Sequence, residues 1–153
     1  MNRGARATGL SRRLVDALFS DAMLLADEAR SYFDDTGRAD RDGLDGAARV
    51  SFACESLKVT TRLMHVVAWL LTRRAVLAGE LSERDAGHPA RALGTSPAID
   101  HAVLATLPER ARALVLASDE LFGRIARIEA DMRRAARPAS PVHDLRQRLE
   151  GAF

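Results

Sequence analysis

A chain of 153 residues with 47% apolar and 29% charged side chains can form one domain with a real core, which excludes a wholly disordered protein. Its formal net charge is only +2, which argues against strong sequence-independent binding of nucleic acid, because such binding needs many phosphate contacts. Aromatic residues make up only 5%, whereas alanine, leucine and arginine, which favour helices, are frequent. We therefore expect an all-α protein.

The cellular compartment is indicated by the single cysteine and by the absence of long apolar segments. Cys54 is the only cysteine, which fits a reducing environment and excludes an intramolecular disulfide. No apolar stretch typical of a secretion signal is present near residue 1, and the stretch from Leu63 to Leu71 is far shorter than the ~20 residues of a membrane span. The sequence predicts a cytoplasmic protein with Cys54 as an inert thiol in the core.

The first helix is predicted over residues 11–36, after a small, polar and flexible N-terminal arm at residues 1–10. Ser11 is a favourable N-cap, and Gly37 is a favourable residue to end the helix. The apolar residues alternate three and four positions apart, which is the spacing of a seam against another helix. They are Val15, Leu18, Ala22, Leu25, Ala29 and Tyr32.

The second helix is predicted over residues 44–78, with Gly79 ending it. Two apolar stripes together cover roughly 200° of its circumference, about twice what one facing helix needs. We therefore expect this helix to be central, with Leu63, Met64, Val67 and Leu71 buried. The first stripe is Val50, Cys54, Leu57, Thr61, Met64, Ala68, Leu71 and Ala75; the second is Ala53, Thr60, Leu63, Val67, Leu70 and Leu77.

Residues 80–106 are predicted to be mostly loop, with short helical turns near residues 82–86 and 98–105, because glycine and proline recur there. The third helix is predicted over residues 107–136. Thr106 and Glu109 have the spacing of a capping box around Pro108, and Pro138 ends the helix. Its apolar stripe is Leu107, Ala111, Leu114, Ser118, Leu121, Ile125, Ile128, Met132 and Ala135.

These elements predict a three-helix bundle of long antiparallel helices over residues 11–137, followed by a flexible C-terminal tail at residues 138–153. The apolar surface exceeds what one small bundle needs, so we expect a homodimer. In the tail, Val142, Leu145 and Leu149 share one helical face, which we expect to dock on a partner as a helix in a groove.

No pattern in the sequence indicates catalysis. The histidines, His65, His88, His101 and His143, lack the spacing of helical metal ligands. No glycine-rich phosphate loop and no nucleophile motif is present. The sequence therefore predicts a binding protein that is not an enzyme and uses no cofactor or metal ion.

A charged stripe lies opposite the predicted core of the second helix. Because tryptophan and arginine anchor many interfaces, we predict that Lys58, Arg62, Trp69 and Arg73 form a partner-binding surface. The alternative is that residues 80–106 fold back and cover Trp69.

The arginine-rich end of the third helix offers a different function, association with DNA or RNA. It contains Arg124, Arg127, Arg133, Arg134 and Arg137. Acidic residues lie between these arginines, and cations near a helix C-terminus also complement the helix dipole. We therefore rank nucleic-acid binding second.

The second helix also carries a family resemblance. It resembles the signature of the alphaproteobacterial regulator of CtrA degradation (RcdA) family through the run Glu55-Ser56-Leu57-Lys58-Val59-Thr60-Thr61-Arg62-Leu63-Met64, then Ala68-Trp69-Leu70-Leu71, Arg74-Ala75-Val76 and Gly79-Glu80. Ser31-Tyr32-Phe33 with Gly37-Arg38 resembles the end of that family's first helix, so the resemblance spans about residues 14 to 130.

The resemblance implies a dimeric three-helix bundle that acts as an adaptor in regulated proteolysis. It implies delivery of cell-cycle transcription regulators such as CtrA, as cargo, to the ClpXP protease. It also implies two protein partners, a response-regulator-like primer of the protease and a cyclic-di-GMP-binding protein.

Overall fold

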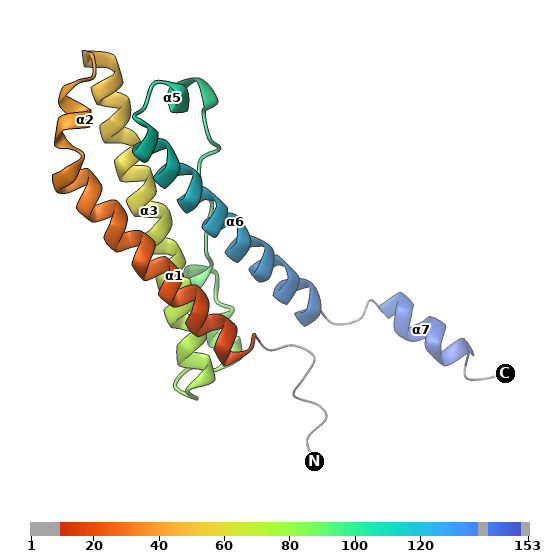
Figure 1. The fold of residues 1–153 in the computed structure, drawn as a ribbon. Helices are drawn as coiled ribbons and strands as arrows, with labels where there is room; N and C mark the ends of the chain where they lie inside the picture. Colours follow the sequence, from red (N-terminus) through yellow and green to blue (C-terminus); the bar gives the residue numbers. More distant parts are fainter. Residues whose placement is uncertain (1–9, 138–140, 151–153) are drawn as a thin grey trace.

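The computed structural model describes residues 10–137 and 141–150, and the regular structure in these ranges is helical (Figure 1). The three long helices are α1 (Arg12–Ser31), α3 (Gly46–Leu77) and α6 (Glu109–Ala136). They run antiparallel in chain order, and α3 packs against both α1 and α6, which share a smaller contact with each other. The predicted bundle with a central second helix is confirmed.

Shorter elements connect the long helices. The π-helical turn η2 (Tyr32–Thr36) and α2 (Arg38–Asp42) join α1 to α3. The connection from α3 to α6 contains α4 (Glu83–Ala86), the 3-10 turn η3 (Pro89–Arg91) and α5 (His101–Ala105). It returns along the bundle, so residues 80–106 lie beside the long helices (Figure 1).

The two ends of the chain are described only in part. Residues 1–9 of the predicted N-terminal arm lie outside the described residues, as do residues 138–140 and 151–153 of the predicted tail. Within the tail, α7 (Pro141–Glu150) is a helix that lies away from the bundle (Figure 1).

Local sequence signals account for most helix ends. The Ser11 Oγ accepts a hydrogen bond from the Leu14 amide at 3.1 Å, and the Asp45 carboxylate accepts one from Ala48 at 2.8 Å. At the end of α3, Gly79 has φ +75°, and the Glu80 amide donates to the Ala75 carbonyl at 2.9 Å. This is a Schellman ending, which a glycine at this position favours.

The predicted capping box at Thr106 is wrong. The Thr106 Oγ1 donates a hydrogen bond to the Val103 carbonyl at 2.7 Å, so this residue ends α5 instead. Helix α6 begins at Glu109 behind Pro108, with no side-chain hydrogen bond at its cap. The sequence pattern assigned Thr106 to the N-cap of α6, but in the structure this residue is the C-cap of α5.

The apolar rows of α1 and α6 face the core as predicted. Leu25 on α1 and Ile128 and Met132 on α6 are half-buried, and Ala135 is exposed. The buried members of the two rows are Val15, Leu18, Ala22, Ala29, Tyr32, Leu107, Ala111, Leu114, Ser118, Leu121 and Ile125.

The predicted orientation of α3 is wrong for much of the helix. Leu63 is buried and Val67 half-buried, but Met64 and Leu71 are 65% and 49% exposed, and Cys54 is an exposed thiol. Arg62, in contrast, is only 2% exposed. Because α3 carries apolar side chains on all sides, its periodicity did not determine which side packs inward.

Candidate partner-binding surface

A row of exposed apolar side chains follows the outer side of α3. Val50, Leu57, Met64 and Leu71 recur at seven-residue intervals and are 64%, 69%, 65% and 49% exposed. Small or weakly polar exposed residues lie between them, namely Cys54, Thr61 and Ala68. We call these seven residues the α3 stripe. Its spacing is that of the a and d positions of a coiled coil, which normally face another helix.

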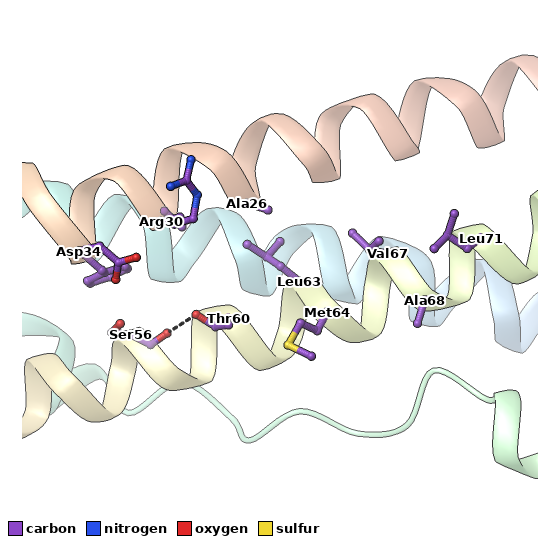
Figure 2. Close-up of a pocket in the computed structure, with 12 residues that line it drawn as sticks. Ala26, Arg30, Asp34, Ser56, Thr60, Leu63, Met64, Val67, Ala68 and Leu71 are labelled. Atoms are coloured by element: carbon purple, nitrogen blue, oxygen red, sulfur yellow. Dashed lines mark hydrogen bonds between the residues drawn. The ribbon is translucent and has the colours of Figure 1, made fainter.

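The α3 stripe borders a groove between α1 and α3 (Figure 2). The groove has a volume of about 640 Å³, and the buried side chain of Leu63 lies at its base while Met64 and Leu71 line its α3 side. Arg30 and Asp34 supply charge near one end. Large contiguous apolar surfaces of this kind mark sites of protein interaction.

The predicted charged stripe on α3 is largely inside the protein. Trp69 is 5% exposed, and its Nε1 donates a hydrogen bond to the Glu129 Oε2 at 2.8 Å. The same oxygen accepts a hydrogen bond from the Leu93 amide at 2.9 Å, which ties residues 80–106 to α6. Arg73, 8% exposed, donates to both carboxylate oxygens of Glu83 at 2.8 Å. The alternative, that residues 80–106 fold back over Trp69, is confirmed.

The predicted exposure of Arg62, Trp69 and Arg73 is therefore wrong, because their polar groups are bonded inside the fold. Of the four predicted surface residues only Lys58 is substantially accessible, with 39% of its side chain exposed. Its Nζ lies 2.9 Å from the Glu55 Oε1. The sequence offered no sign of the partners of Arg62, Trp69 and Arg73, because these lie from ten to sixty positions away along the chain.

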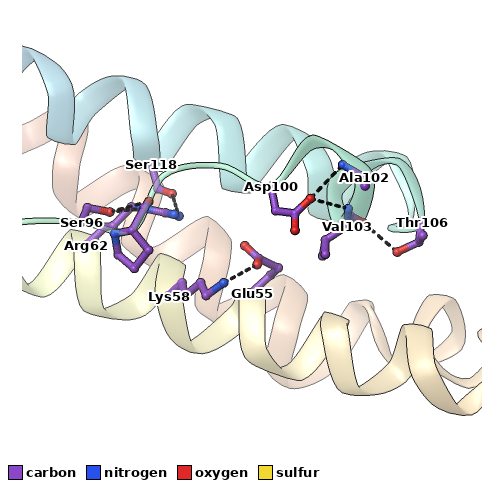
Figure 3. A network of polar contacts seen from close by, with 10 residues as sticks. Glu55, Lys58, Arg62, Ser96, Asp100, Ala102, Val103, Thr106 and Ser118 are labelled. Carbon is purple, nitrogen blue, oxygen red and sulfur yellow. Dashed lines mark hydrogen bonds and ion pairs between the residues drawn. The ribbon is translucent and has the colours of Figure 1, made fainter.

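Arg62 is bonded to hydroxyl groups (Figure 3). Its Nε donates to the Ser96 Oγ at 2.8 Å and its Nη1 to the Ser118 Oγ at 3.3 Å. The Ser118 hydroxyl in turn donates to the Val115 carbonyl at 2.9 Å. This network joins α3, α6 and the connection before α5.

Tyr32 is buried where α1 meets η2. Its hydroxyl donates a hydrogen bond to the Asp40 Oδ2 at 2.8 Å. Burial raises the pKa of this phenol above its usual value, and the hydrogen bond to Asp40 and the charge of Asp40 raise it further. Tyr32 therefore stays protonated and holds α2 against the bundle.

Helix α7 presents its apolar residues to solvent. Val142, Leu145 and Leu149 are 73%, 63% and 57% exposed and share one side of the helix. Their role as a docking face stays a prediction.

The arginine-rich end of α6 contains internal ion pairs. Arg133 lies 3.4 Å from Glu129, and Arg134 pairs with Asp131. These pairs reduce the free positive charge that a nucleic-acid backbone would need.

Residues 10–137 and 141–150 offer neither a metal-binding cluster nor a membrane-spanning helix. They contain no group of three or more histidine, cysteine, aspartate or glutamate side chains that could hold a metal ion. Among the helices placed by the structure, none is both long and apolar enough to cross a bilayer.

The fold and the surface define a helical-bundle protein with an exposed apolar row on α3. The chain belongs to the family described as "Protein of unknown function (DUF1465)", whose model matches residues 6–153. It is similar to the crystal structure of RcdA from Caulobacter crescentus CB15, with 32% sequence identity and a TM-score of 0.67, over 82% of this chain and 95% of that chain. The resemblance to the RcdA family is thus confirmed. No curated protein matches the chain.

Proposed function

We propose that this protein is a non-catalytic adaptor that helps deliver cell-cycle regulatory proteins such as CtrA to the ClpXP protease. The observation that carries the proposal is the exposed α3 stripe on a bundle that is similar to RcdA. An adaptor works by holding other proteins, and an uncovered row of large apolar side chains suits that task. A response-regulator-like primer of the protease and a cyclic-di-GMP-binding protein complete the proposed set of partners.

The α3 stripe also supports a homodimer. Its four large residues span three heptads, and no charged residue lies within the stripe, so two copies can meet without charge repulsion. A two-fold contact would place the same stripe of each copy against the other and close the assembly. The apolar face of α7 remains available for cargo in this arrangement, as a helix that enters a partner's groove.

Reconstituted proteolysis tests the adaptor function. Purified ClpXP, CtrA, the primer and the cyclic-di-GMP-binding protein are mixed with and without this protein, and the remaining CtrA is followed over time. We expect faster loss of CtrA when the protein is present. An equal rate of loss in both mixtures would contradict the adaptor function.

A variant pair tests the α3 stripe. Leu57→Glu places a charge on the stripe, whereas Leu24→Glu places one on an equally exposed leucine of α1, since the two side chains are 69% and 70% exposed. Sedimentation should return a dimer for the wild type and Leu24→Glu and a monomer for Leu57→Glu. A monomeric wild type at micromolar concentration would reject the dimer and leave the adaptor function to the proteolysis assay.

Truncation tests the tail. Deleting residues 138–153 should leave the melting temperature nearly unchanged and weaken the delivery of at least some cargo. A large loss of stability, or unchanged delivery of every cargo tried, would contradict the docking role of α7.

A further inference from the structure

A second, smaller cavity of about 160 Å³ lies between α3, α6 and the segment that precedes α5. It lies beside the Arg62 network of Figure 3. Three cationic or imidazole side chains and three hydroxyl side chains line it, and no carboxylate does. The six polar side chains are Lys58, Arg62, His65, Thr61, Thr95 and Ser96. A concave site with only donors, hydroxyls and an imidazole at its polar positions is suited to an anion.

The buried guanidinium of Arg62 has no ionic partner in the part of the chain that the structure describes. It is 2% exposed, and its two hydrogen bonds go to the neutral hydroxyls of Ser96 and Ser118. A guanidinium carries five N–H donors, so these contacts leave several donors for another acceptor. A buried cation without a counter-ion is unfavourable, because bonds to two neutral hydroxyls replace only part of its lost hydration.

The serines do not supply the missing charge. The Ser118 hydroxyl donates to the Val115 carbonyl at 2.9 Å, and the Ser96 hydroxyl lies 3.5 Å from the Pro97 carbonyl. Glu55, the nearest acidic residue along α3, is held by Lys58 at 2.9 Å and does not line the cavity. The cavity can be reached from solvent, since Thr61, His65 and Thr95 are exposed.

We propose that this cavity binds a small tetrahedral oxyanion of the phosphate class. Donors from α3 and from the connection surround the cavity on different sides, which matches an ion with several acceptor oxygens better than a planar carboxylate with two. Arg62 provides the buried charge, Lys58 and His65 approach from the solvent side, and the hydroxyls complete the donor set. This inference does not depend on the adaptor function.

Binding is measured with inorganic phosphate, by phosphorus NMR and by thermal melting in chloride buffer at constant ionic strength. The wild type should show saturable binding and a melting temperature that rises with phosphate. Lys58→Gln and His65→Asn alter solvent-reachable side chains, so they should fold normally and bind phosphate about tenfold more weakly, the effect of losing one charge-assisted hydrogen bond. Arg124→Gln removes an exposed charge on α6 away from the cavity and should bind like the wild type.

Arg62→Met tests the buried charge itself. Without phosphate this variant should melt no lower than the wild type, because methionine removes an uncompensated cation from the interior. Phosphate should then raise only the wild-type melting temperature. A large drop in stability for Arg62→Met together with equal phosphate effects in the wild type and Lys58→Gln would overturn the proposal, because Arg62 would then be only a structural donor to the serines.

Two further probes identify the source of the anion. If inorganic phosphate binds in a manner that depends on Lys58 and Arg62, a free ion suffices. If O-phosphoserine binding depends on Lys58 and Arg62 and inorganic phosphate does not bind, the phosphate group is carried on a larger molecule. This result also supports the proposed site. Acetate that binds as tightly as phosphate would overturn the phosphate class, and so would the failure of both phosphate probes to bind.

Discussion

Replacing Glu129 by alanine should loosen the connection between α3 and α6 from the bundle. One carboxylate oxygen of Glu129 accepts hydrogen bonds from the Trp69 indole at 2.8 Å and from the Leu93 amide at 2.9 Å. The Glu129→Ala variant leaves both donors without an acceptor. Water cannot easily replace it, because Trp69 is 5% and Leu93 2% exposed. The substitution therefore removes the acceptor that joins residues 80–106 to both α3 and α6.

The magnitude follows from the two bonds. A hydrogen bond to a charged group contributes about 1.5–3 kcal/mol, so two would give about 3–6 kcal/mol. Because 18% of the Glu129 side chain is exposed, water can reach part of the site, and we expect a loss of about 2–4 kcal/mol. The Glu129→Gln variant keeps an acceptor oxygen of the same shape and should lose about 1 kcal/mol.

Urea unfolding measures the loss, and fluorescence localises it because Trp69 is the only tryptophan. Glu129→Ala should shift the emission of the folded protein to longer wavelength as water reaches the indole. Glu120→Ala is the matched control, since it makes the same change at an exposed position of α6 and carries the same gain in helix propensity. If the two alanine variants unfold within about 0.5 kcal/mol of each other and emit alike, the shared acceptor does not hold the connection.

Three further outcomes are expected. The wild type should lose stability as the pH rises above about 10, because the folded-state pKa of Tyr32 lies above its unfolded value. Urea titrations should show that Tyr32→Phe removes this loss and lowers the stability at pH 7 by about 1 kcal/mol. Gly37→Ala should cost about 1–3 kcal/mol, because a Cβ there would lie 2.5 Å from the Tyr32 carbonyl oxygen. Gly46→Ala is the control, since a Cβ there would meet nothing within 4 Å and should not lower the melting temperature. In the Leu57→Glu background, which we expect to be monomeric, Leu63→Ala should cost about 2–5 kcal/mol and Met64→Ala less than about 0.5 kcal/mol in the same assay, since only Leu63 is buried within one chain; similar losses would contradict the orientation of α3.

The sequence predicted the fold well where each helix has one apolar side. On α1 and α6 the rows that include Val15 and Leu18, or Leu114 and Ile125, are buried as their spacing indicated. Glycine and serine at the ends of α1 and α3 identified helix limits because their backbone and side-chain chemistry acts locally. These features need no knowledge of distant parts of the chain.

The candidate site could not be predicted in the same way, because its contacts are distant in sequence. Trp69 and Glu129 are sixty positions apart, and Arg62 and Ser118 fifty-six. The hydrophobic pattern placed the charged residues of α3 on the surface. That assignment fails when polar groups inside the fold can form hydrogen bonds with them. On α3 the bonding partners exist, so polar side chains lie inside and Met64 lies outside.

The inward polar residues of α3 explain why its apolar stripe is exposed. An apolar helix side could pack in several rotations at similar free energy, whereas a buried polar group must reach its own partner. The contacts of Trp69 with Glu129 and of Arg73 with Glu83 are satisfied in one rotation of the helix, which also places Arg62 beside Ser118. That rotation directs the α3 stripe away from the core. Because a monomer rarely leaves such a contiguous apolar row uncovered, the contacts that fix the interior of this protein also determine which surface we propose for binding another chain.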